Sequence, residues 1–255
     1  MTQKLRTIAL PPEHGSWGLT LEPILLGLLI APSWAGAGLA LGAFGAFLLR
    51  WPVKVAQTSR RQNRHARMGI ALRFVGLYAV ITLLGFGVGI WQAGWSPLMP
   101  LLPALPFGLI FFFYDSHNQS RSWQAELAGP VAFSAMAASI ALAGGVTLPL
   151  AMALWAVLVA RAVPSVLYVR ARLRLDQDKP HQPLIVFVSH GVAVIGIAAL
   201  SGMSLLPWLS VAVMVLLLGR ALVGLSSYRR TVPVKVIGFT ELGWGLLNVA
   251  MVAFF

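Results

Sequence analysis

Charged residues are confined to short clusters in this chain, and the long stretches between the clusters contain none. The 255 residues include 19 Lys and Arg and seven Asp and Glu, yet residues 23–49, 74–114, 127–160 and 182–219 have no charged side chain. Each stretch is long enough for one membrane crossing, because a spanning helix needs about 20 apolar residues, and the longer ones hold most of two. The pattern predicts helical hairpins with uncharged turns on one side of a membrane and charged connections on the other.

The composition agrees with this interpretation. The mean hydropathy is +0.81, and only 10% of the residues are charged, against about 25% in soluble domains. We therefore expect one all-α transmembrane domain over residues 1–255. The chain has no cysteine, which excludes disulfides, thiolate nucleophiles and Cys-ligated metals. The net charge of +12 lies in loops beside apolar spans, as the positive-inside rule produces, so we expect no nucleic-acid partner.

The apolar stretches predict about nine spanning helices. Lys and Arg gather in alternate connections, which puts the N-terminus in the cytoplasm and the C-terminus outside. The runs of small residues at 36–38 and 135–138 predict close helix packing. The expected spans are residues 15–31, 36–57, 68–91, 97–114, 122–143, 147–170, 183–201, 204–224 and 235–254.

Several ionisable residues fall inside these spans, toward the cytoplasmic side: Glu22, Glu126, Arg161 and Glu241. A charge at membrane depth is costly unless it is paired or faces a polar cavity, so each of these residues is a candidate for function. The structural alternative is a set of buried salt bridges, for example between Arg161 and Glu126.

Three sets of polar residues recur at helical spacing and strengthen the expectation of a cavity. The first set lies at the end of the second span, and the second set lies at the end of the sixth span. The third set extends from residue 115 to residue 126 if that segment is helical. Arg binds phosphate or carboxylate through paired hydrogen bonds, so the pattern predicts a site for an anionic headgroup. The candidate ligand-binding residues are Arg50, Lys54, Gln57, Asn118, Arg121, Arg161, Ser165, Tyr168 and Arg172.

A short polar motif at residues 11–18 precedes the first span. Glu13 and His14 are candidates for an acid–base pair, with Glu126 as a further candidate for moving protons. The alternative for Glu13 is a purely structural role at a helix start, where a negative charge favours the helix dipole. We predict no metal and no cofactor, and we leave open whether Asp176 and Asp178 bind a metal.

Three segments together resemble the YwiC-like family of bacterial membrane proteins. They are Pro-x-Glu-His-Gly-x-Trp at residues 11–17, Arg-x-x-x-x-Glu-x-x-Gly at 121–129, and Ser-Val-x-Tyr-Val-Arg-x-Arg at 165–172. The resemblance implies a multi-pass protein of the bacterial cytoplasmic membrane. More loosely, nine helices with polar residues at the ends of the second and sixth spans resemble UbiA-type prenyltransferases, which hold Mg²⁺ in two Asp-rich motifs. Here Arg50, Lys54, Arg161 and Arg172 stand at those ends, so a two-metal site is not expected.

Three functions fit these observations. The first is a UbiA-like protein that binds an anionic-headed lipid or an isoprenoid phosphate in a cationic cavity, with or without a prenyltransferase-like reaction. The second is a small-anion transporter. The third is a non-catalytic subunit or assembly factor of a membrane complex. We rank the lipid site first, because the outer halves of the spans have few polar residues for a transport path.

Overall fold

Helices make up almost all of the described chain. The structure is a computed structural model that describes residues 2–12 and 14–254; for residues 2–4 and 14–16 it describes the backbone only. The described residues form ten α-helices and one 3₁₀ helix, and they include no strand. The elements are α1 (Thr2–Ala9), α2 (His14–Ile30), α3 (Trp34–Arg61), α4 (His65–Ala93), η1 (Ser96–Leu98), α5 (Leu101–Ser116), α6 (Trp123–Ala143), α7 (Leu148–Leu175), α8 (Pro183–Gly202), α9 (Trp208–Gly224) and α10 (Val234–Ala253).

The predicted membrane helices are confirmed. Among the described residues, six helices are long and apolar enough to cross a membrane, and α2, α5 and α9 are shorter apolar helices. Helices α3 and α7 extend beyond their predicted spans, to Arg61 and Leu175. Each has 28 residues, or about 42 Å, against about 30 Å of hydrocarbon core. The extra turns hold the charged residues, which remain helical where they can be solvated.

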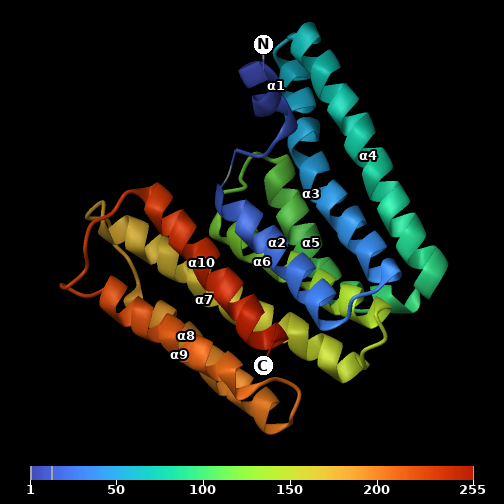
Figure 1. The fold of residues 1–255 in the computed structure, drawn as a ribbon. Coiled ribbons are helices and arrows are strands. Elements are labelled where there is room, and N and C mark those ends of the chain that lie inside the picture. Colours follow the sequence, from blue (N-terminus) through green and yellow to red (C-terminus); the bar gives the residue numbers. More distant parts are fainter. Residues whose placement is uncertain (1, 13, 255) are drawn as a thin grey trace.

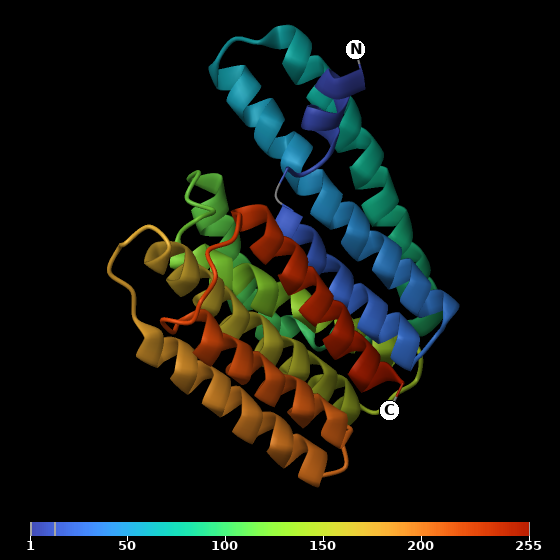
Figure 2. The ribbon, with the colours of Figure 1, turned by 60° about the vertical axis from the view of Figure 1, so that its left-hand side comes forward.

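The bundle has a central group of helices with a hairpin on either side. Helix α2 packs against α6 and α10, and α6 packs against α7 (Figure 1). The α3–α4 hairpin lies on one side and projects beyond the other helices, and α8 and α9 lie on the opposite side (Figure 2). We call the end of the bundle with the α3–α4, α5–α6, α7–α8 and α9–α10 connections the charged end, and the other the uncharged end.

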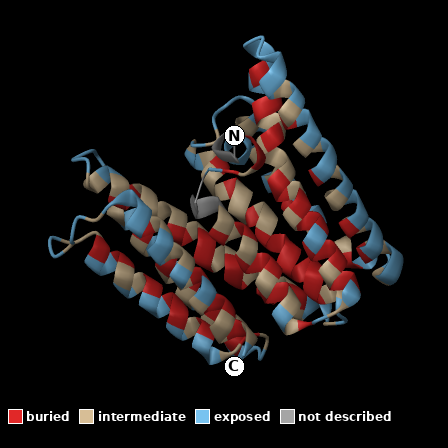
Figure 3. Ribbon diagram, turned by 45° about the horizontal axis from the view of Figure 1, so that its top comes forward, coloured by how far each residue is buried: buried red, intermediate tan, exposed pale blue. Residues whose placement is uncertain are grey.

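Burial follows this arrangement. Buried residues concentrate where α2, α3, α6 and α7 meet, whereas α4 is exposed along most of its length (Figure 3). Its exposed side chains include Leu77, Leu83 and Leu84. In a chain of this composition, such a surface faces lipid rather than water.

Small residues allow the closest helix contacts, as predicted. Ala135, Ala137 and Ala138 of α6 are fully buried. Between α3 and α4, a Cβ added at Gly38 would lie 2.8 Å from the backbone nitrogen of Gly89. Backbones this close require residues without side chains, a common device of membrane helices.

Helix α1 was not predicted from the sequence. It packs beside α3 and α4, where Ile8 is buried with Val55 and Ala71. The indole nitrogen of Trp51 donates a hydrogen bond to the carbonyl oxygen of Thr7 at 3.0 Å. Eight residues are too few to form a stable helix alone, so α1 depends on this packing.

Candidate functional site: an ionic network inside the bundle

Four charged side chains from four helices meet inside the bundle. They are Glu22 of α2, Arg161 of α7, Arg220 of α9 and Glu241 of α10, and we call them the ionic network. Arg161 lies 13 residues from the uncharged end of α7, or about 20 Å along the helix axis. The network therefore lies at membrane depth, nearer the charged end.

Arg161 holds two carboxylates from different helices. Its Nη2 lies 3.3 Å from Oε1 of Glu22 and 3.9 Å from Oε2 of Glu241. The same nitrogen donates a hydrogen bond to the backbone oxygen of Glu241. The side chains of Arg161 and Glu22 are only 2% and 4% exposed, so α2, α7 and α10 are joined through a desolvated ion pair.

Arg220 completes the network and faces its polar and aromatic neighbours. Nη1 of Arg220 donates a hydrogen bond to Oε1 of Glu241, and Nη2 lies 3.4 Å from Oγ of Ser165. The guanidinium carbon lies 4.3 Å from the ring centre of Tyr168 and 5.9 Å from that of Trp244. Cation–π contacts of this kind stabilise a desolvated guanidinium.

The charges of the network balance, but several of its polar atoms have no hydrogen-bond partner within the described residues. Two guanidinium groups face two carboxylates. Within the described residues, Nε of Arg161, Nε of Arg220, Oε1 of Glu22 and Oε2 of Glu241 are buried and have no hydrogen-bond partner. Buried polar groups are nearly always hydrogen-bonded, so these four atoms give the network capacity for further hydrogen-bond partners.

Gly245 gives Glu22 the space to enter the network. A Cβ added at Gly245 would overlap the carboxylate of Glu22. Gly245 lies one helical turn beyond Glu241 on α10, so both face α2. The absence of a side chain here is therefore part of the geometry of the site.

His190 lies at the edge of the network on α8. It is 1% exposed, its Nδ1 lies 2.8 Å from the carbonyl oxygen of Val186, and its Nε2 has no partner within the described residues. Nδ1 therefore bears the proton, because a carbonyl can only accept. His190 is near enough to interact electrostatically with Arg220 and Glu241.

Arg50 and Lys54 belong to a different cluster, on α3. Nη2 of Arg50 lies 2.9 Å and Nζ of Lys54 lies 3.1 Å from Oδ1 of Asp115, at the charged end of α5. Burial would raise the pKa of Asp115, but the hydrogen bonds and positive charges of the two cations outweigh it and lower this pKa below its ordinary value. The cluster ties α3 to α5.

Arg172 is held at the charged end of α7. It donates hydrogen bonds to Oδ2 of Asp176 at 3.1 Å and to the backbone oxygens of Gly224 and Arg230. Arg229 contacts the other oxygen of Asp176 at 3.3 Å. Arg172 thus fastens the connection between α9 and α10 to α7.

The structure does not bring Arg50, Arg161 and Arg172 to one chamber, since each contacts carboxylates of its own. It does bring Ser165 and Tyr168 to Arg220, which shares Glu241 with Arg161. Gln57 instead lines a surface hollow with Arg60 and Arg61.

The condition for the third set of polar residues, a helical segment over residues 115–126, is not met. Helix α5 ends at Ser116, Asn118 has a φ of 58°, and Ser122 caps α6 by accepting a hydrogen bond from the amide of Ala125. A left-handed residue breaks the helical register, so these side chains do not share one face.

The suggested pairing of Arg161 with Glu126 is also wrong. Arg170 pairs with Glu126 and donates to the backbone oxygen of Arg121 at 3.3 Å. Glu13 and the side chain of His14 lie outside the described residues. Asp176 is ion-paired, and no group of three or more His, Asp or Glu residues that could hold a metal occurs in the described part of the chain.

Sequence reasoning left Arg220 out of the candidate site, although the signal was present. Arg220 follows 38 uncharged residues and lies inside the predicted span 204–224, so it met the criterion that singled out Arg161. Glu22 and Glu241 were noted as buried charges but were not assigned to the site.

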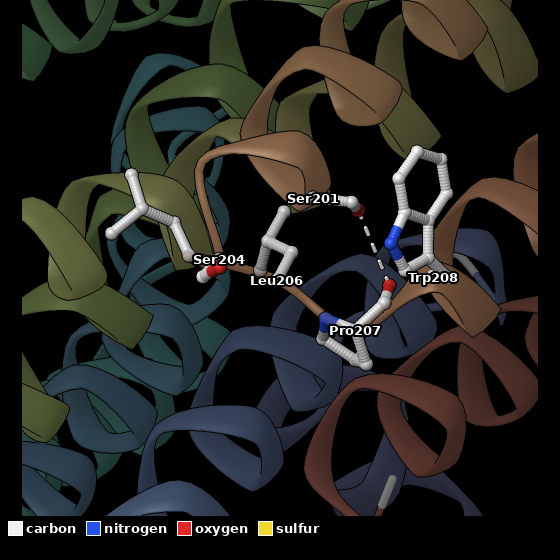
Figure 4. Close-up of a pocket in the computed structure, with 6 residues that line it drawn as sticks. Ser201, Ser204, Leu206, Pro207 and Trp208 are labelled. Atoms are coloured by element: carbon white, nitrogen blue, oxygen red, sulfur yellow. Dashed lines mark hydrogen bonds between the residues drawn. The ribbon is translucent and has the colours of Figure 1, made fainter.

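A second hollow lies at the uncharged end, in the turn between α8 and α9. It is lined by Ser201, Ser204 and residues 205–208, with Oγ of Ser201 donating to the carbonyl oxygen of Pro207 at 3.3 Å (Figure 4). No ionisable side chain lines this hollow. It therefore offers none of the chemistry found in the ionic network.

Comparison with known proteins gives one match. No curated protein and no solved structure matches the chain. The model of the YwiC-like protein family matches residues 10–141, a region that includes Glu22 and ends within α6. Since the matched region is more than half of the 255 residues, this multi-pass membrane protein belongs to the YwiC-like family.

Proposed function

We propose that the protein binds the anionic headgroup of a membrane lipid or an isoprenoid phosphate at the ionic network. The observation that supports this most is the pair of guanidinium groups of Arg161 and Arg220, whose buried Nε–H groups have no acceptor within the described residues. A phosphate oxygen supplies the acceptor that each donor lacks, and guanidinium groups bind phosphate through paired hydrogen bonds.

The neighbours of Arg220 suit the same ligand. Ser165 carries a hydroxyl group beside the guanidinium that can donate to a further phosphate oxygen, and the ring of Tyr168 covers the guanidinium. The apolar surfaces of the surrounding helices suit a hydrocarbon tail. In this proposal the charged end is cytoplasmic, as the distribution of Lys and Arg favours, and the ligand enters from the inner leaflet of a bacterial cytoplasmic membrane.

The proposal is for binding and does not include prenyl transfer. The two-metal chemistry of UbiA-type enzymes needs several carboxylates free to hold Mg²⁺. Glu22 and Glu241 contact arginines instead, as do Glu126 and Asp176. Cation–phosphate contacts from arginine would serve in place of the metal.

The test compares the amount of anionic lipid that co-purifies with the wild type and with a variant that lacks one ion pair but keeps the same net charge. Arg220→Gln/Glu241→Gln should lower the co-purified anionic lipid, measured by mass spectrometry, about tenfold or more, because charge-assisted hydrogen bonds are lost. The matched control is Arg229→Gln/Asp176→Asn, which removes a pair outside the network. Equal lipid retention by both folded variants would refute the proposal.

A small-anion transporter is the second candidate, and one observation favours it. Asn248 lies seven residues from Glu241 on α10, on the same helix face and toward the uncharged end. It is fully buried, and neither atom of its amide has a partner within the described residues. Polar groups therefore continue outward from the network. Uptake of a labelled anion into proteoliposomes, lost on Asn248→Leu, separates transport from binding alone.

A further inference from the structure

We propose that the ionic network takes up one proton when an anionic headgroup binds, and that Glu22 is the carboxylate that receives it. The inference rests on the proposed function, because it concerns the same site. It adds a coupling between ligand and proton that binding alone does not require.

The reason is charge balance inside the bundle. The positive charges of Arg161 and Arg220 already match the negative charges of Glu22 and Glu241. A bound anion would leave one negative charge uncompensated in a desolvated site, and a buried unpaired charge is strongly unfavourable. Transfer of a proton from water to a carboxylate oxygen gives a neutral carboxylic acid and restores the balance, with no other bond changed.

Glu22 is the less firmly held of the two carboxylates. Glu241 accepts a hydrogen bond from Arg220 and also lies 3.9 Å from Arg161. Glu22 has one cationic neighbour, Arg161 at 3.3 Å, and its Oε1 has no hydrogen bond within the described residues. An anion that draws Arg161 toward itself removes the contact that favours the ionised form of Glu22.

The surroundings of Glu22 provide no other charge that could compensate. Arg161 from α7 and Glu241 from α10 are the charged groups that interact with it. Helices α3 and α6 also pack against α2, but their charged residues lie at the charged end of the bundle, where Arg50 and Lys54 are paired with Asp115 and Glu126 is paired with Arg170. The remaining parts of both helices, within stretches 23–49 and 127–160, contain no charged residue. Gly245 of α10 lies directly against the carboxylate and cannot donate a side-chain hydrogen bond.

The experiment counts protons by isothermal titration calorimetry of the full chain in an uncharged detergent. The probe is a short-chain phosphatidylglycerol, whose phosphodiester keeps a single charge over the pH range used. Dimethyl phosphate is the second probe, which separates recognition of a lipid from recognition of a free anion. Each titration is run in two cationic buffers with different enthalpies of ionisation, since the difference in measured heat gives the protons taken up for each ligand bound.

At a pH above the pKa of the free site, the wild type should take up about one proton per bound ligand, and its Kd should weaken about tenfold for each further pH unit. In Glu22→Gln, proton uptake should fall to near zero and the Kd should become independent of pH, because the amide imitates the protonated acid. Asp115→Asn is the matched control; it alters a partly buried, ion-paired carboxylate outside the network, and should keep the wild-type proton uptake.

The other outcomes are decisive. Binding without proton uptake in the wild type would overturn the inference and leave the proposed function standing, even if Glu22→Gln failed to fold. Undiminished uptake in Glu22→Gln would overturn the assignment to Glu22. Failure of the wild type to bind either probe would instead overturn the proposed function, and the inference with it.

Discussion

The side chain of Arg161 connects three helices inside the bundle. It contacts carboxylates from α2 and α10 and is 2% exposed. Its depth could be predicted from the sequence, because a charge in a long apolar stretch is visible there. Its partners could not, because they depend on which helices are neighbours. Arg161 and Arg170 are nine residues apart on α7, or about 13 Å, and this difference in depth explains why Glu126 pairs with Arg170.

We expect Arg161→Met to destabilise the protein by about 3–5 kcal/mol, because Glu22 would be left buried without a cation. Adding Glu22→Gln should recover most of the lost stability, since the amide has no charge that needs a cation. Unfolding titrations of the purified protein measure both effects. Arg170→Gln serves for comparison and should cost about 1 kcal/mol or less, because its ion pair with Glu126 is 31% and 33% exposed. Equal losses for Arg161→Met and Arg170→Gln would contradict the role given to Arg161.

At the scale of elements, the sequence predicted helices better than the segments between them. Apolar length indicates where a membrane helix lies, so each of the nine predicted spans roughly coincides with a described apolar helix, and six of these helices are long enough to cross a membrane. Two features could not be found in this way. Helix α1 is short and depends on packing against α3 and α4, and the left-handed Asn118 in the α5–α6 connection decides which side chains of residues 115–126 can share a face. Both are set by local backbone geometry and tertiary contact rather than by hydropathy.

The α3–α4 hairpin provides a prediction at this scale. A Cβ at Gly85 would overlap the backbone of Gly42, whereas nothing lies within 4 Å of a Cβ at Gly87. Gly85→Ala should therefore destabilise the hairpin by about 1–3 kcal/mol through overpacking. Gly87→Ala, two residues away on the lipid-facing side, should be neutral or slightly stabilising, because alanine favours a helix. Thermal unfolding of the two variants compares them directly, and a similar melting temperature would argue against close α3–α4 contact.

At the scale of the molecule, the two ends of the bundle differ in a way the sequence had indicated. Trp34, Trp91, Trp95 and Trp208 are all exposed at the uncharged end, as in an aromatic belt at a membrane surface. The charged connections gather at the other end. The positive-inside rule predicts an orientation from this asymmetry, while the relative placement of the helices needed three-dimensional structure.

The absence of native cysteine makes the orientation easy to test. Ser96→Cys lies at the uncharged end and Ser227→Cys at the charged end, and both serines are exposed. An impermeant maleimide should label Ser96→Cys in intact cells and should label Ser227→Cys only after the membrane is opened, because the charged end is expected in the cytoplasm. The reverse labelling pattern would invert the topology.

The ionic network also has a consequence for how the chain is made. Glu22 emerges from the ribosome in the first spanning helix, its arginine follows only in α7, and the last member arrives with α10. We therefore expect Glu22 to be protonated, or shielded from lipid by the insertion machinery, until α7 and α10 have been inserted. A nascent chain truncated before residue 161 would lack that arginine, so its first helix should leave the bilayer more readily than in the finished protein.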